Sequence, residues 1–183
     1  IGAALAREFA GRGARLALCD LNAAALEALS GELGALHMVC DVTVESHIQA
    51  LVAEVEARLG PVDIFFSNAG FSSGEPDHAA SAPDRIWQAS WEVHVMAHVY
   101  ACRALLPAMR ARGQGYLVQM ASAAGLLNQI GDAAYSTSKH APRDEMPNFI
   151  QEKRARGEEI ILDQDAIEVD DGDRIYGPMG NRE

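Results

Sequence analysis

Short apolar runs alternate along this chain with longer segments in which apolar residues recur at helical spacing, and no other feature limits the fold as strongly. Four runs are almost continuously apolar: Leu16–Cys19, Leu36–Cys40, Val62–Ser67 and Tyr116–Ala121. Strands of a parallel sheet that is covered by helices on both faces have this composition. The sequence therefore predicts an α/β fold with a doubly wound parallel sheet.

The segments between these runs predict helices. The clearest lies between Thr43, which we place as a cap, and Gly60-Pro61, which we place as a stop. A second helix is expected from about Trp87 to Arg112, and a third should carry Tyr135 and Lys139. The first of these helices has its apolar residues on one stripe: Val44, Ile48, Leu51, Val52, Val55 and Leu59.

Both ends of the chain depart from this pattern. Ile1-Gly2 stands directly on a helical pattern, so the predicted sheet lacks the strand that would lead into this helix. Over residues 142–183 acidic side chains are dense and prolines and glycines recur, with a small hairpin predicted around Asp171-Gly172. We therefore expect one domain over residues 1–141, whose last helix ends near Ala141, and an atypical acidic tail over residues 142–183.

Composition and charge exclude several classes of partner. The formal net charge of the 183 residues is -11, which leaves no basic surface for nucleic acid or an anionic membrane. No run reaches the roughly 18 apolar residues of a membrane-spanning helix, and the first residues lack a signal-peptide pattern, so a cytoplasmic location is expected. Cys19, Cys40 and Cys102 match no disulfide or metal spacing, and we predict buried free thiols and no metal site.

A few polar residues stand where chemistry could occur. Tyr135 and Lys139, four residues apart, should lie side by side on one helix face, where the ammonium would stabilise a phenolate and favour proton transfer. Ser122 ends an apolar strand, so its hydroxyl should reach the carboxyl edge of the sheet, where such sheets bind ligands. Asn68-Ala69-Gly70 ends the strand before it. Each feature alone also fits a simpler role: an exposed helical pair, a capping serine or a turn.

In their order and spacing, these residues resemble the motifs of the short-chain dehydrogenase/reductase family. Asn68-Ala69-Gly70 matches the Asn-Ala-Gly motif, Ser122 matches the active-site serine thirteen residues before the tyrosine, and Tyr135–Lys139 matches Tyr-x-x-x-Lys. Ile1-Gly2 looks like the end of the Thr-Gly-x-x-x-Gly-Ile-Gly cofactor loop. The resemblance covers about residues 1–141 and implies a Rossmann-like domain that binds a dinucleotide and carries the catalytic site.

The resemblance implies an NAD(P)-dependent oxidoreductase that interconverts an alcohol and a ketone or aldehyde by hydride transfer. Tyr135 would be the general acid or base, Ser122 would bind the reacting oxygen, and Lys139 would hold the nicotinamide ribose. Ile1-Gly2, at the start of a helix, would face the pyrophosphate, because free backbone N–H groups and the helix dipole favour an anion there. Asn68-Ala69-Gly70 would lie beside the cofactor.

Two acidic positions bear on the choice of cofactor. Asp20 closes a strand eighteen residues after Gly2, where a carboxylate accepts hydrogen bonds from the adenosine ribose and repels a 2′-phosphate. NAD is therefore expected in preference to NADP. Asp41 and Val42 match the position that resembles the family's adenine contacts. A cap for the following helix is the alternative role for Asp20, and it suits Asp41 equally well.

One position departs from the family pattern. His94 stands forty-one residues before Tyr135, where relatives carry the asparagine of the catalytic tetrad, which supports a water linked to the lysine. His94 would either replace that asparagine in the relay or simply pack, and His98 is assigned to packing. This departure favours one alternative to an active dehydrogenase, a nucleotide-binding pseudo-enzyme or regulatory protein. A second alternative is an epimerase or dehydratase, because such enzymes share Tyr-x-x-x-Lys.

The sequence indicates only the polarity of the substrate. Four apolar residues stand near the predicted site and favour a hydrophobic alcohol or ketone, although core packing would explain them equally: Phe71, Leu126, Leu127 and Ile130. Relatives dimerise through the Tyr-x-x-x-Lys helix. Because Pro142 stands where this helix would continue, a homo-oligomer remains an open alternative.

Overall fold

The computed structural model describes residues 1–75, 77–78, 81–127 and 130–141. They belong to one compact unit that spans Ile1–Met146. The predicted acidic tail and its hairpin lie outside the described residues, and the domain boundary at residue 141 stays a prediction.

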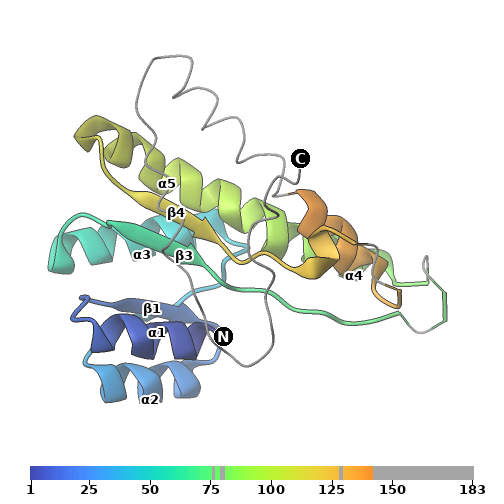
Figure 1. Cartoon of the computed structure of the whole chain (residues 1–183), viewed down its shortest axis with the longest axis horizontal. Coiled ribbons are helices and arrows are strands. Elements are labelled where there is room, and N and C mark those ends of the chain that lie inside the picture. Colours follow the sequence, from blue (N-terminus) through green and yellow to red (C-terminus); the bar gives the residue numbers. More distant parts are fainter. Residues whose placement is uncertain (76, 79–80, 128–129, 142–183) are drawn as a thin grey trace, which may run out of the picture. The chain divides into compact units, whose positions relative to one another are not determined.

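Helices and strands alternate along the described chain as the apolar pattern predicts (Figure 1). The strands are β1 (Ala17–Asp20), β2 (Leu36–Val39), β3 (Ile64–Ser67) and β4 (Tyr116–Gln119). The helices are α1 (Gly2–Gly11), α2 (Ala23–Leu33), α3 (Glu45–Leu59), α4 (Asp84–Trp91) and α5 (Ala97–Arg112). A π-helical turn η1 (Glu92–Met96) joins α4 to α5, and a 3-10 turn η2 (Ala123–Gly125) follows β4. Residues 133–141 form a further helix, which we call the Tyr135 helix.

All strand pairs in the described chain are parallel. β1 pairs with β2, with Ala17 opposite Leu36, and β3 pairs with β4, with Ile64 opposite Tyr116. No described strand joins β1 to β3, so the sheet consists of two pairs. The predicted α/β class with parallel strands is confirmed.

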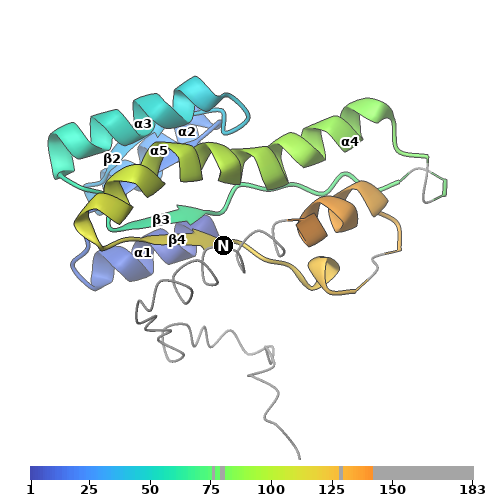
Figure 2. The same cartoon turned by 90° about the horizontal axis from the view of Figure 1, so that it is seen from above.

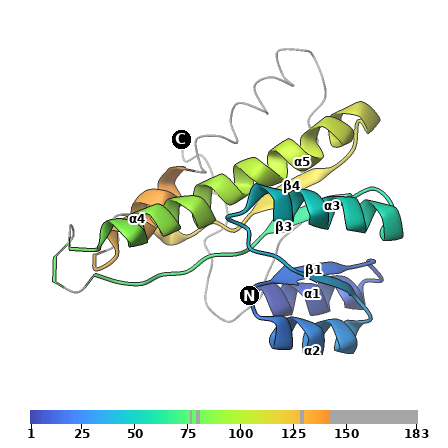
Figure 3. The same ribbon diagram turned by 180° about the vertical axis from the view of Figure 1, so that it is seen from behind.

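The core lies where α3 and α5 meet, beside β3 and β4 (Figure 3). One cluster of buried side chains contains Ile48 of α3 and Ala101 of α5, and a second contains Val52 and Leu105 from the same helices. Phe65 of β3 packs against both clusters. α1 and α2 contact each other and lie beside β1 (Figures 1 and 3). The predicted stripe on α3 therefore faces the core through Ile48, Leu51 and Val52, whereas its first member, Val44, is exposed.

Three local expectations need correction. The strands are only half-buried, and Val39, Ile64 and Tyr116 are exposed, because each pair is two strands wide and every strand has a free edge. Thr43 is not the cap of α3: the N-cap is Val44, and the Thr43 hydroxyl donates instead to Asp41. The helix expected as one piece from about residue 87 to 112 is continuous, but the π-helical turn η1 interrupts its regular spacing (Figure 2).

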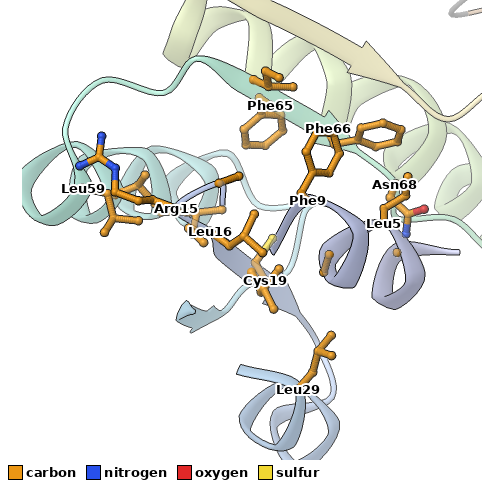
Figure 4. Close-up of a pocket in the computed structure, with 18 of the residues that line it drawn as sticks. Leu5, Phe9, Arg15, Leu16, Cys19, Leu29, Leu59, Phe65, Phe66 and Asn68 are labelled. Carbon is orange, nitrogen blue, oxygen red and sulfur yellow. The ribbon is translucent and has the colours of Figure 1, made fainter. Parts of the chain in front are cut away.

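A cavity of about 730 Å³ lies between the two strand pairs (Figure 4). It is lined by residues of β1 and β3 together with residues of α1, α2 and α3. Most of the side chains drawn around it are apolar, among them Leu5, Phe9, Leu16, Phe65 and Phe66. The cavity therefore adjoins the edges of β1 and β3 that β2 and β4 leave unpaired.

Candidate active site

The Tyr135 helix brings its two candidate residues together. The Lys139 Nζ lies 5.8 Å from the centre of the Tyr135 ring, as the four-residue spacing predicts. Lys139 is only 7% exposed, so the alternative interpretation of Tyr135 and Lys139 as an exposed helical pair is excluded. Its Nζ donates to the Met120 carbonyl at the end of β4, at 3.0 Å. Burial lowers the pKa of Lys139 from its ordinary value.

Ser122 is held beside the same helix by the turn that follows it. Its Oγ accepts from the Ala124 N–H at 3.2 Å, so it caps η2, the simpler role noted for it. The Ser136 hydroxyl donates to the Ala124 carbonyl at 2.9 Å. Gly125 lies directly against the Lys139 carbonyl, where a Cβ would have no room. The hydroxyl of Ser122 keeps its own proton for a further partner.

The Asn68-Ala69-Gly70 motif links the start of α1 to the Tyr135 helix. A Cβ added to Gly2 would lie 2.7 Å from the Asn68 Nδ2. A Cβ added to Gly70 would lie 3.3 Å from the His94 Nε2 and 3.7 Å from the Lys139 Nζ. A side chain at Gly2 would therefore have to displace the Asn68 amide, and one at Gly70 would crowd the His94 ring. Ala69 is exposed.

His94 is fully buried and joins two segments by hydrogen bonds. Its Nε2 lies 3.1 Å from the Phe71 N–H, which can only donate, so Nε2 is the acceptor and Nδ1 carries the proton. Nδ1 therefore donates to the Ser138 hydroxyl at 2.8 Å, and that hydroxyl donates to the Tyr135 carbonyl at 3.0 Å. The His94 ring also meets the Tyr135 ring edge-on, with centres 5.2 Å apart. His94 thus does more than fill space.

The surroundings keep His94 neutral. Burial, the nearby charge of Lys139 and the neighbouring His98 lower its pKa to about 4, although Asp132 acts in the opposite direction. Burial and Lys139 also lower the pKa of His98 to about 4. The Nδ1 of His98 has no hydrogen-bond partner among the described residues, which agrees with the packing role predicted for it.

These two histidines predict a loss of stability in mild acid. Between pH 6.5 and pH 4 each histidine is protonated in the unfolded chain but neutral in the folded one. The free energy of unfolding therefore decreases as the pH is lowered, by up to about 1.4 kcal/mol per pH unit for each histidine. Urea midpoints between pH 7.5 and 4.5 measure this slope. His94→Asn keeps one donor and one acceptor without titrating, so it should flatten the slope. An unchanged slope in this variant would contradict the assignment.

The acidic positions near the cofactor motif differ in what they contact. Asp20 is exposed at the end of β1, and its Oδ1 accepts from the Asn22 N–H at 2.8 Å. Asn22, rather than Asp20, caps α2 by accepting from the Ala25 N–H at 3.1 Å. Gly2, Asp20 and Asn68 all line the 730 Å³ cavity. The helix-capping alternative for Asp20 is therefore wrong.

Asp41 and Val42 have structural roles in this chain. Asp41 accepts from the hydroxyl and the N–H of Thr43, and these bonds lower the pKa of its carboxyl. Val42 packs against the core cluster that contains Cys40 and Ile48. Cys40 is buried, but the other two cysteines are only half-buried, and none of the three forms a disulfide.

The sequence analysis missed the residues whose hydrogen bonds join the segments of the site. Asp132, Glu75 and Ser138 all bond across this region, and none was singled out beforehand. The available signal was Gly131-Asp132 directly before the helix, since aspartate is a favoured N-cap. Three of the four apolar residues expected to line the site are on the surface rather than in the core: Leu126 is 59% exposed, Leu127 69% and Ile130 99%. The fourth, Phe71, is half-buried.

Comparison with protein families assigns residues 1–160 to the family described as short chain dehydrogenase. The chain belongs to the short-chain dehydrogenase family. Mouse epidermal retinol dehydrogenase 2 is 34% identical over 147 residues, which cover 77% of this chain and 47% of that protein. D-Threitol dehydrogenase from Mycolicibacterium smegmatis is 35% identical over 144 residues, which cover 76% of this chain and 55% of that protein.

Solved structures of short-chain dehydrogenases share the fold. A short chain dehydrogenase/reductase from Burkholderia phymatum, crystallised in complex with NAD, superimposes with a TM-score of 0.80 at 29% identity. The match covers 86% of this chain and 58% of that one. This short-chain dehydrogenase chain spans about half the length of the curated relatives it matches. None of its described helices is long and apolar enough to cross a membrane.

Proposed function

We propose that this short-chain dehydrogenase interconverts an alcohol and a ketone or aldehyde, with Tyr135 as the group that moves the proton. The observation that carries the proposal is the buried Lys139 ammonium beside the Tyr135 ring, with Gly70 close by, since a Cβ added there would lie 3.7 Å from the Lys139 Nζ. An ammonium near a phenol favours the phenolate, which is the form that accepts a proton from an alcohol. Ser122 would donate its hydroxyl proton to the reacting oxygen.

The chain's own residues fit a nicotinamide dinucleotide. The N–H groups that begin α1 at Gly2 have no side-chain cap, and they lie at one end of the 730 Å³ cavity with Asn68 and Asp20 in its lining. Free N–H groups at a helix start bind phosphate, and an exposed carboxylate binds ribose hydroxyls. When bound, the nicotinamide supplies hydride transfer. Lys139 would hold its ribose, and Asn68-Ala69-Gly70 would pack beside it.

NAD should bind more tightly than NADP because of Asp20. Its carboxylate is exposed and does not cap α2, so it can accept from ribose hydroxyls and repel a 2′-phosphate. Titrations of NADH and NADPH, followed by cofactor fluorescence, should show the higher affinity for NADH, and Asp20→Ala should reduce the ratio of the two affinities. Glu27→Ala is a matched loss of charge on exposed α2 and should leave the ratio unchanged. Equal affinities in the wild type would refute the role of Asp20.

The surface of the site favours a hydrophobic alcohol or ketone. Leu126 and Leu127 are exposed just after η2, and Ile130 lies just before the Tyr135 helix. Exposed apolar side chains gathered beside a candidate site are typical of a surface that binds an apolar ligand. Turnover with a panel of alcohols of increasing alkyl length tests this proposal.

A protein that binds the nucleotide without turnover is the second candidate. His94 in place of the tetrad asparagine favours it, because both ring nitrogens of His94 are already occupied by hydrogen bonds with the Phe71 N–H and the Ser138 hydroxyl. Maize sex determination protein tasselseed-2 is a relative, 34% identical over 86% of this chain and 48% of that protein. Binding of NADH without turnover of any alcohol in the panel would support this candidate and reject the enzyme.

A further inference from the structure

Asp132 is the most heavily bonded side chain around the candidate site, and no catalytic role has been assigned to it above. It is 2% exposed. Its Oδ1 accepts from the Tyr135 N–H at 3.0 Å, which makes it the side-chain cap of the Tyr135 helix. Its Oδ2 accepts from the Ser72 hydroxyl at 2.5 Å and from the N–H groups of Ser73 and Gly74, each at 3.1 Å.

The two oxygens therefore serve different segments of the chain. Oδ1 accepts from the helix that carries Tyr135 and Lys139, whereas Oδ2 accepts from the segment directly after Asn68-Ala69-Gly70. Ser72 is sixty residues from Asp132 along the chain. A single carboxylate thus fixes the helix with the acid–base group against the loop of the cofactor motif.

Two further side chains, Glu75 and His94, hold the same segment to the same helix. Glu75 accepts from the Ala133 N–H at 2.5 Å, so the loop also caps the helix. His94 links the Phe71 N–H to Ser138. We call residues 71–75 with these partners the loop clamp. Asp132 is its centre, because only Asp132 accepts from both the loop and the helix.

We propose that Asp132 is a positioning residue that sets the Tyr135 helix against the Asn68-Ala69-Gly70 motif, and so aligns Tyr135 and Lys139 with the bound cofactor. This inference rests on the proposed function. Misplacement of a reacting group by about 1 Å costs on the order of 10²-fold in rate, so a change at Asp132 should act on turnover more than on cofactor binding. Because Asp132 is buried and its oxygens already accept four hydrogen bonds, we assign it no contact with substrate or cofactor.

The carboxylate is ionised where the protein would work. Burial by itself would raise the pKa of Asp132, but bonds from Ser72 and the N–H groups of Tyr135, Gly74 and Ser73 together lower it below its ordinary value. Lys139, His98 and His94 occupy the same neighbourhood, and Asp132 is the charge there that favours protonation of His94. The two histidines stay neutral, so their charge does not compete for the carboxylate.

Asp132→Asn provides an isosteric test because an amide has one acceptor where the carboxylate has two. If the amide oxygen of this asparagine faces the Tyr135 N–H, its NH₂ group faces the N–H groups of Ser73 and Gly74, so donor faces donor in the loop. In the reverse orientation the NH₂ group faces the Tyr135 N–H, so donor faces donor at the helix. Asparagine can therefore serve the helix or the loop but not both. Asp132→Ala removes both acceptors.

The experiment measures the clamp and the turnover separately. Hydrogen exchange should accelerate by about tenfold or more at the Ser73, Gly74 and Tyr135 amides in Asp132→Ala, since all three lose their acceptor, and on one side only, either at Ser73 and Gly74 or at Tyr135, in Asp132→Asn. Steady-state kinetics on a hydrophobic alcohol with NAD should show kcat lower by on the order of 10²-fold, with NADH binding nearly unchanged. The pH at which kcat falls to half should also shift, because the surroundings of Tyr135 change.

Asn22→Ala is the matched control. It removes the side-chain cap of α2, a helix that does not carry Tyr135, so it should cost similar stability and leave exchange at 73–74 and the pH profile unchanged. Unchanged exchange at Ser73, Gly74 and Tyr135 in Asp132→Ala would overturn the clamp whether or not the protein is an enzyme. Faster exchange with wild-type kcat would overturn the positioning role alone. A wild type without turnover would refute the proposed function and with it that role.

Discussion

Tyr135→Phe should abolish turnover while NADH still binds. The substitution removes one hydroxyl, and the rest of the ring keeps its edge-on contact with the buried His94. Loss of a general acid or base costs about 10²–10⁴-fold in rate, and here no second phenol stands beside Lys139 among the described residues. Steady-state kinetics and cofactor fluorescence measure the two properties independently.

The control for this experiment is Tyr116→Phe, the same chemical change on an exposed residue at the start of β4. It should leave both properties intact. Lys139→Ala should damage turnover and binding together, because the ammonium contacts Tyr135 and also bonds to the Met120 carbonyl. Wild-type activity in Tyr135→Phe would show that the proton is moved by another group.

A strand joined to Ile1 should raise the stability of the domain by on the order of 5 kcal/mol, because it would bury two or three large apolar side chains. The cavity between β1 and β3 is lined mainly by apolar side chains, and each strand offers an unpaired edge beside it. Gly2 lies against Asn68, so α1 begins at the carboxyl end of β3. A strand that runs into α1 would therefore lie parallel to both neighbours, and α1 would form a right-handed crossover to β1.

The test joins a five-residue Val/Ile segment and a glycine turn ahead of Ile1 and measures the urea midpoint. Continuous β-branched residues suit a strand buried on both faces. The matched control carries proline at the centre of the segment, where it removes a ladder hydrogen bond. Only the first extension should raise the midpoint. Equal midpoints for the two extensions would show that the cavity does not accept a strand.

Prediction from sequence worked best where the determining contacts are local. The runs that include Leu36 and Tyr116 form parallel strands, as predicted, because the spacing of apolar residues along the chain distinguishes strands from helices. The spacing of Tyr135 and Lys139 placed both on one helix face, because helix geometry depends on a few neighbouring residues. The exposure of the strands was misjudged, since burial depends on how many strands lie side by side.

The candidate site shows the limit of such reasoning. His94 has its hydrogen-bond partners 23 and 44 residues away, and Asp132 reaches a hydroxyl sixty residues away. Spacing cannot reveal these bonds, because they depend on which loops the parallel strands bring to one edge of the sheet. The sequence by itself determined the α/β class, the parallel strands and the shared face of Tyr135 and Lys139. Only the tertiary structure decided that His94 is a neutral link and that Asp132 joins loop to helix, because a buried polar group takes its role from whatever partner the fold places beside it.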